Sequence, residues 1–369
     1  ILSIVVGLCS GLAATALKTA VLYTNAFLLS FGTSTFVGGT NNDGLNYRTE
    51  YNSNYFGSNG ALYNNYGDGA RGELITDNLN NVYVGSTTFS SDFPVTTGCL
   101  QPSLGGMQDG VIFKLDYNLK NLLWSTFLGG SNDDAVYSID TDNEYNVVVC
   151  GGTGSSDFPT TTGSFQNTFG GGRADGFFSK ISYHGDQLMG STYMGSNEYD
   201  QIYFVRCGKD GDIFGYGQTN ATGSTWIYNA NYNTPNSGML LIRLSGDLTG
   251  RIWSTVFGTA NGKPNLSPTA FGVDICNRIY AVGWGRDFVP YTANWNTAGT
   301  WNMSVTPNAY QNTTDGQDFY LISLDRDAAH LEYATFFGEL HPNDPNDHYH
   351  GSDHVDGGTS RFDRLGTLY

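Results

Sequence analysis

The sequence predicts an all-β protein, a β-propeller made of four-stranded antiparallel blades, on three observations. Gly (49), Tyr (24) and Phe (22) are abundant and charged residues make up only 14%, a composition that favours turns and aromatic strands over helices. Short runs of alternating or β-branched apolar residues, such as VIFKL and LLWSTFLG, are separated by clusters of Asn, Asp, Gly and Pro. One short element, Ser or Ala followed by Thr, two apolar residues and Gly, begins at residues 34, 125, 191, 254 and 334.

The recurring element closes a longer repeat, which is clearest in two copies. Residues 78–130 and 143–195 match element by element, and each contains the short strands of one antiparallel meander. A four-stranded sheet cannot bury both faces alone, and radial packing of such sheets around an axis solves this. The copies are longer than the about 40 to 50 residues of common propeller repeats, so we expect long loops. A β-sandwich array is the alternative, but the Cys-Trp landmarks of immunoglobulin-like domains are missing.

The repeat divides the chain into expected segments. Residues 1–20 are an apolar N-terminal segment, either the remnant of a signal peptide or a buried element, and 21–39 are expected to be the end of a blade. Residues 40–71, rich in Asn, Tyr and Gly, are expected to form a surface insertion. Either the two ends complete one blade together or the polypeptide continues further, and the mid-strand stop at Tyr369 favours continuation. The blades are expected at about 72–130, 131–195, 196–258 and 259–338, with a partial one at 339–369.

The balance of charges limits the partners. The chain has 17 Lys and Arg against 34 Asp and Glu, a formal net charge of −17, which disfavours nucleic acid and anionic membranes. Its five cysteines contain no C-x-x-C pair, so neither a zinc site nor a disulfide framework is indicated. Cys150, Cys207 and Cys276 lie in apolar, strand-like runs and are expected to be buried thiols. One disulfide between neighbouring strands is the alternative.

Each clear copy carries turn residues with a structural rationale. Asp-Phe-Pro at 92–94 and 157–159 combines a turn-forming Asp, an aromatic ring that can fill the space between blades, and a Pro that needs no ladder hydrogen bond. A Gly pair precedes Asp109 and Asp175 in the two copies. Such a pair suits a tight turn with positive φ, in which the Asp side chain caps nearby amides.

Two sets of side chains are metal candidates. Acidic turns at 132–134, 140–142 and 210–212 offer the hard oxygen ligands that Ca²⁺ takes, although Asx-turns explain them more simply. The stretch 341–358 holds four of the six histidines, interleaved with aspartates. Its side chains could ligate zinc or another transition metal, and an exposed polar loop is the alternative. The candidate ligands there are His348, His350, Asp353 and His354. No other cofactor is expected.

The paired phrases SSDFPVTTGCLQPSLGGMQDGVIFKLD and SSDFPTTTGSFQNTFGGGRADGFFSKI, each closed by STFLGG or STYMG, resemble the bacterial β-propeller repeat called SBBP. That family reads approximately D-F-P-T-T-x-G-A-F-Q, then G-G-x-D-A-F-V-x-K, then Y-S-T-Y-L-G-G. The match spans about 72–195, whereas 287–290 and 315–325 keep fragments and 196–258 keep only the closing strand. The last stretch, residues 353–369, resembles propellers in large surface proteins of gliding, type IX-secreting bacteria. The resemblance implies an exported, non-enzymatic, cell-surface module.

The expected function is binding. Aromatic rings beside Asn and Asp can stack on sugars and hydrogen-bond their hydroxyls, and Tyr and Trp also anchor protein interfaces. We therefore expect a non-catalytic, secreted cell-surface propeller, associated with the outer membrane without a membrane span, that binds a protein or glycan in adhesion or gliding. Alternatively, the candidate aromatic residues pack within the propeller and bind no ligand. The candidate ligand-binding residues are Trp226, Tyr228, Tyr232, Tyr291, Trp295 and Trp301.

Two other functional classes stay open. A carbohydrate-active propeller enzyme would use paired carboxylates, which need not be near each other in sequence, although neither G-x-S-x-G nor H-E-x-x-H occurs. A structural spacer or a cargo of the type IX translocon would have the outer-membrane secretion machinery as its partner. Because the acidic residues recur with the repeat, the sequence favours an architectural role for them over catalysis.

Overall fold

The computed structural model describes residues 36–44, 46, 62, 65, 68–285, 298–339, 362 and 367–368. Within them lie sixteen strands and one short 3-10 helix, η1 (Asp68–Ala70). The expected N-terminal segment 1–20, and most of 21–39, 40–71 and 339–369, lie outside the described residues.

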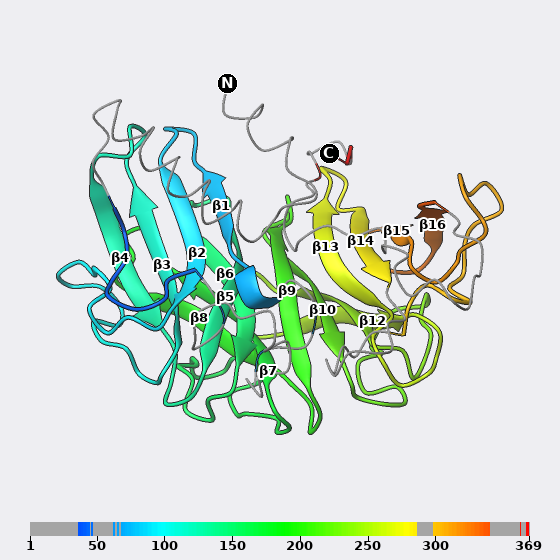
Figure 1. Cartoon of the computed structure of the whole chain (residues 1–369), viewed down its shortest axis with the longest axis horizontal. Coiled ribbons are helices and arrows are strands. Elements are labelled where there is room, and N and C mark those ends of the chain that lie inside the picture. Colours follow the sequence, from blue (N-terminus) through cyan, green and yellow to red (C-terminus); the bar gives the residue numbers. More distant parts are fainter. Residues whose placement is uncertain are drawn as a thin grey trace, which may run out of the picture.

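The strands form four four-stranded antiparallel sheets, blades 1 to 4 in chain order, and in each sheet the strand order follows the sequence (Figure 1). Blade 1 consists of β1 (Glu73–Thr76), β2 (Val82–Thr88), β3 (Asp109–Leu115) and β4 (Leu122–Leu128). Blade 2 consists of β5 (Asp134–Thr141), β6 (Val147–Thr153), β7 (Asp175–Ile181) and β8 (Leu188–Met194). Blade 3 consists of β9 (Asp200–Cys207), β10 (Ile213–Thr219), β11 (Met239–Leu244) and β12 (Arg251–Phe257). Blade 4 consists of β13 (Leu266–Val273), β14 (Ile279–Gly285), β15 (Phe319–Leu324) and β16 (Leu331–Phe337). The predicted all-β propeller architecture with four-stranded antiparallel blades is confirmed.

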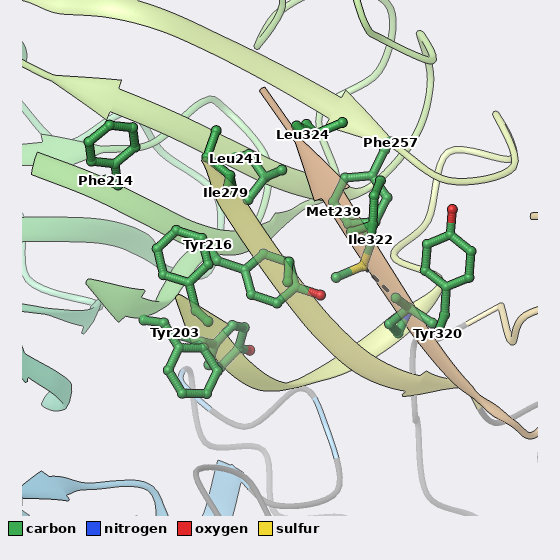
Figure 2. Packing of buried hydrophobic residues seen from close by; sticks show 14 of the residues in the cluster. Tyr203, Phe214, Tyr216, Met239, Leu241, Phe257, Ile279, Tyr320, Ile322 and Leu324 are labelled. Carbon is green, nitrogen blue, oxygen red and sulfur yellow. Dashed lines mark hydrogen bonds between the residues drawn. The ribbon is translucent and has the colours of Figure 1, made fainter. Parts of the chain in front are cut away.

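Apolar side chains from neighbouring blades pack into shared cores. The ring of Phe158, from one of the Asp-Phe-Pro turns, lies 4.4 Å from that of Phe177 in the core between blades 1 and 2. Between blades 3 and 4, Tyr216, Phe257 and Tyr320 form a stack with ring-centroid distances of 6.3 and 6.4 Å (Figure 2). Blades 2 and 3 pack against neighbouring blades on both faces, so their strands are largely buried, and burial of these rings drives the blades together.

The first strand of each blade lies innermost. Strand β5 contacts β1 and β9, and β9 contacts β13. A buried ion pair crosses these strands, because Glu73 of β1 lies 2.8 Å from the guanidinium of Arg206 in β9. Ser138 of β5 hydrogen-bonds the same carboxylate. The innermost strands of blades 1, 2 and 3 are therefore tied together by one carboxylate.

Glycine is required for different reasons in the two copies of the repeated Gly pair. Asp109 accepts the N–H groups of Gly105 and Gly106 at 2.8 and 3.2 Å, which confirms the expected capping. The expected positive φ is found only in the second copy, at 171–172, where φ is 125° and 68°. In the first copy a Cβ on Gly106 would lie 2.0 Å from the carbonyl oxygen of Asn132, so close approach of two backbones requires the glycine there.

The cysteine prediction is correct for one thiol and wrong for another. Cys150 in β6 is fully buried, as expected, and Cys207 at the end of β9 is partly buried. Cys276 is exposed because it lies in the turn between β13 and β14, where its N–H donates to the carboxylate of Asp274 at 2.7 Å. The four described cysteines are free, so no disulfide joins them.

Candidate functional site

The structure places the expected binding residues in different environments. Tyr228 and Trp301 are exposed by 43% and 40%, whereas Trp226 is buried at 5%. Tyr232 is partly buried against the core between blades 3 and 4. Trp226 and Tyr228 belong to the loop between β10 and β11, while Trp301 belongs to blade 4. The remaining expected binding and metal residues lie outside the described part of the chain: Tyr291, Trp295, His348, His350, Asp353 and His354.

The loop that carries Trp226 and Tyr228 is attached to its blade in its own way. In blades 1, 2 and 4 a glutamine side chain fastens the corresponding loop, because its Oε1 accepts the N–H of the glycine that follows the fourth strand; these residues are Gln101, Gln166 and Gln311. In blade 3, Tyr228 instead forms an antiparallel bridge with Ser254 of β12, with two N–H···O bonds of 2.9 Å. The Ser254 hydroxyl also donates to the carbonyl of Trp226 at 2.7 Å. The loop thus lies along the outermost strand of blade 3.

The buried side chain of Trp226 anchors the loop that carries Tyr228. Its indole N–H donates to Asp200 Oδ1 at 3.1 Å, and its side chain packs in the core between blades 2 and 3. A ring buried in this way is not an exposed stacking platform for a sugar. Its contribution is to hold the backbone of Tyr228 in place, two residues further along the chain.

An arginine that the sequence analysis missed completes the site. The guanidinium carbon of Arg251, the first residue of β12, lies 4.6 Å from the ring centroid of Tyr228, 5.3 Å from that of Phe165 and 5.9 Å from that of Trp226. Phe165 comes from the neighbouring blade 2, and its N–H donates to Leu248 O of blade 3 at 2.9 Å. We call Phe165, Trp226, Tyr228 and Arg251 the arginine–aromatic site.

The guanidinium of this site has few polar partners among the described residues. Arg251 donates to Ser254 Oγ at 3.3 Å and forms no ion pair with a described residue. Burial lowers the pKa of Arg251, an effect that Tyr228 opposes. Arg243 shows the contrast, since its guanidinium pairs with Asp212 at 2.6 Å and with Asp327 at 3.0 Å. The arginine–aromatic site therefore holds a half-buried positive charge among rings.

Paired carboxylates of the kind that an enzyme would need occur at two blade boundaries, but they are buried. Asp109 and Asp134 meet between blades 1 and 2, and Asp175 and Asp200 between blades 2 and 3. Burial raises the pKa of Asp109 to about 6 and the pKa values of Asp134 and Asp175 to about 7, and it raises that of Asp200 as well. All four residues have 0% exposed surface. Raised carboxyl pKa values often mark active sites, but here no surface is open to a substrate.

A second polar cluster lies at the innermost strands and is also closed. Arg71 pairs with Asp68 at 2.8 Å and lies over the ring of Tyr203 at 4.2 Å. The side chain of Asn65 donates to Tyr203 Oη at 2.8 Å and to Gln218 Oε1 at 2.9 Å. These five residues are buried, and through them residues 65, 68 and 71 pack against β9 and β10.

Among the described residues, no three His, Cys, Asp or Glu side chains gather into a group that could hold a metal ion. Carboxylates of the acidic turns accept protein donors instead: Asp140 Oδ2 accepts Cys207 N–H at 2.8 Å, and Asp212 pairs with Arg243. Calcium binding stays a prediction. Within 68–285 and 298–339, no helix is long and apolar enough to cross a membrane.

Comparison with known proteins gives remote structural likenesses. No family model matches the chain, and no curated protein matches it. BamB from Moraxella catarrhalis is similar with a TM-score of 0.28 and 10% identity, over 71% of this chain and 63% of BamB. The extracellular domain of a hybrid two-component system from B. thetaiotaomicron has a TM-score of 0.28 and 12% identity, over 72% of this chain and 37% of the other. The Pyrococcus horikoshii acylaminoacyl peptidase has a TM-score of 0.28 and 9% identity, over 68% and 42%. The propeller architecture of this chain rests on its own sheet topology.

Proposed function

We propose that this chain is a non-catalytic module of a secreted, cell-surface protein and that it binds glycan at the arginine–aromatic site of blade 3. The observation that carries the proposal is the exposed ring of Tyr228, fixed to β12 beside Arg251. A sugar ring buries its apolar C–H face on an aromatic ring, while neighbouring polar groups bind its hydroxyls.

The ring of Tyr228 is held before any ligand arrives. Two hydrogen bonds join the backbone of Tyr228 to that of Ser254, the guanidinium of Arg251 lies over the ring, and the bond from Trp226 to Asp200 anchors the preceding turn. A preorganised aromatic surface binds with less loss of conformational entropy than a mobile one. The exposed side chains of Asn229 and Asn231 stand next to it in the sequence and offer amide donors and acceptors to sugar hydroxyls.

Two further features support a binding role without catalysis. The paired carboxylates at the blade boundaries are buried and serve as caps for backbone amides. The sequence carries no nucleophile elbow or zinc-protease motif. The resemblance of 72–195 to SBBP repeats supports an exported module, and the resemblance of 353–369 to propellers of gliding, type IX-secreting bacteria supports a surface location and a role in adhesion or gliding. Copurification with outer-membrane secretion proteins is the expected result if export proceeds by that route.

The test is retention of the purified protein on a glycan array, followed by titration of the best-bound glycan. Tyr228→Ala is expected to weaken binding about tenfold, equivalent to about 1.4 kcal/mol, because the stacking surface is lost. Tyr310→Ala is the matched control, since Tyr310 is 78% exposed in the corresponding loop of blade 4. Absence of binding to every glycan, or an equal effect of the two substitutions, would overturn the proposal.

A further inference from the structure

We infer that Arg251 binds the carboxylate of a sugar acid, so that the ligand of the arginine–aromatic site is a glycan carrying isolated uronic acid residues. The inference rests on the proposed glycan-binding function and adds the chemical class of the ligand. Its basis is a half-buried guanidinium without a described carboxylate partner, next to the exposed ring of Tyr228.

Comparison among the blades shows that Arg251 is not part of the scaffold. The fourth strands align as LLWSTFL, LMGSTYM, RIWSTVF and LEYATFF, so the first position is leucine in blades 1, 2 and 4 and arginine only in blade 3. Leu188 and Leu331, at this position, pack against the hydrophobic cores. Blade architecture therefore accepts an apolar residue here, and the scaffold does not explain the charge in blade 3.

The surroundings of Arg251 leave its charge uncompensated. Burial of a charge is unfavourable unless a counter-charge and hydrogen bonds accompany it, and the other buried arginines follow this rule. Arg71, Arg206 and Arg243 each pair with at least one carboxylate within 2.8 Å. Arg251 has three ring centroids within 5.9 Å of its guanidinium carbon and one hydroxyl at 3.3 Å. An incoming carboxylate would supply the missing partner and could accept two parallel N–H bonds from the guanidinium.

The net charge of the chain limits which anionic ligands can bind at Arg251. A net charge of −17 repels densely charged polymers such as nucleic acids or heavily sulfated glycans. A glycan that carries a single carboxylate is repelled much less, because it brings only one negative charge close to the protein. In physiological salt, screening limits electrostatic repulsion to about 8 Å. The guanidinium carbon lies over the ring of Tyr228, 4.6 Å from its centroid, so a hexuronic acid that packs against the exposed edge of this ring would bring its exocyclic carboxylate to the guanidinium.

The test compares two pairs of simple ligands that differ only in the carboxylate. Methyl β-D-glucuronide is measured against methyl β-D-glucoside, and methyl α-D-galacturonide against methyl α-D-galactoside, by ligand-observed NMR titration of the full chain. Wild type is expected to bind at least one uronide about tenfold more tightly than its neutral counterpart, because charge-assisted hydrogen bonds to arginine are stronger than neutral ones.

Arg251→Leu is the decisive variant, because it installs the residue that the other three blades carry at this position and so should fold. It is expected to abolish the preference, so that the uronide and the neutral sugar bind with equal affinity, whereas Arg251→Lys keeps part of the preference. Equal affinity of wild type for both members of each pair, or a preference that survives in Arg251→Leu, overturns this inference alone. Failure of all four sugars, together with an empty glycan array, overturns the proposed function with it.

Discussion

Neutralising one buried carboxyl group is expected to stabilise the protein in a strictly pH-dependent way. Asp134 Oδ2 accepts hydrogen bonds from Gly130 N–H at 2.7 Å and from the Ser155 hydroxyl at 2.8 Å, whereas its Oδ1 has no partner among the described residues. Burial raises its pKa to about 7, and the nearby carboxylate of Asp109 contributes to the rise. Substitution Asp134→Asn keeps an oxygen for both donors and removes the charge.

The sign and size of the change in the free energy of unfolding follow from the linkage between protonation and folding. Because the pKa of Asp134 is higher in the folded state, its ionisation favours the unfolded state, and stability from this group is lost as the pH rises from about 4 to about 7. The shift from 3.8 to about 7 corresponds, at 1.36 kcal/mol per pKa unit, to an upper limit of about 4 kcal/mol. At about pH 8, Asp134→Asn should therefore have a larger free energy of unfolding than wild type by up to that amount. At about pH 4 the two proteins should be nearly equal.

The assay is urea unfolding of both proteins across this pH range, with a chelator present so that a bound cation does not mask the charge. Asp157→Asn is the control of opposite sign, since hydrogen bonds from Ser131 lower the pKa of Asp157. That variant should lose stability at neutral pH. A difference between wild type and Asp134→Asn that stays constant from about pH 4 to about pH 8 would refute the reasoning.

Two other predictions concern the innermost strands and the thiols. Glu73→Gln should lower the free energy of unfolding by about 3 to 5 kcal/mol, because the buried charge of Arg206 loses its partner, and a urea midpoint within error of wild type would contradict this. In native protein treated with a maleimide, peptide mapping should find Cys276 modified and Cys150 unmodified, because the first thiol is exposed and the second is buried with a raised pKa; equal labelling would show that the β6 core opens readily.

The repeat was sufficient to predict the blades, because strand and turn chemistry recur in a fixed order along the chain. The capping of amides by Asp109 was predictable for the same reason, since a glycine pair followed by Asp is a local pattern. Apart from the ring of Phe158 in its Asp-Phe-Pro turn, contacts between blades could not be predicted in this way. Trp226 and Tyr228 have the same kind of sequence context, yet the bond to Asp200 buries one while the other stays exposed. Arg251 could have been noticed only by aligning the fourth strands, and its aromatic neighbours come from two blades.

The bridge between Tyr228 and Ser254 has a consequence for how such a chain diversifies. The two hydrogen bonds of the bridge join main-chain atoms, so this pairing does not depend on the identity of the side chain at position 228. The side chain at position 228 can therefore vary while the sheet keeps its register, whereas the buried side chain of Trp226 cannot. Grafting the loop and the first residue of its fourth strand onto blade 4 would leave Phe165 of blade 2 in place and would give a bivalent protein whose avidity exceeds that of either site.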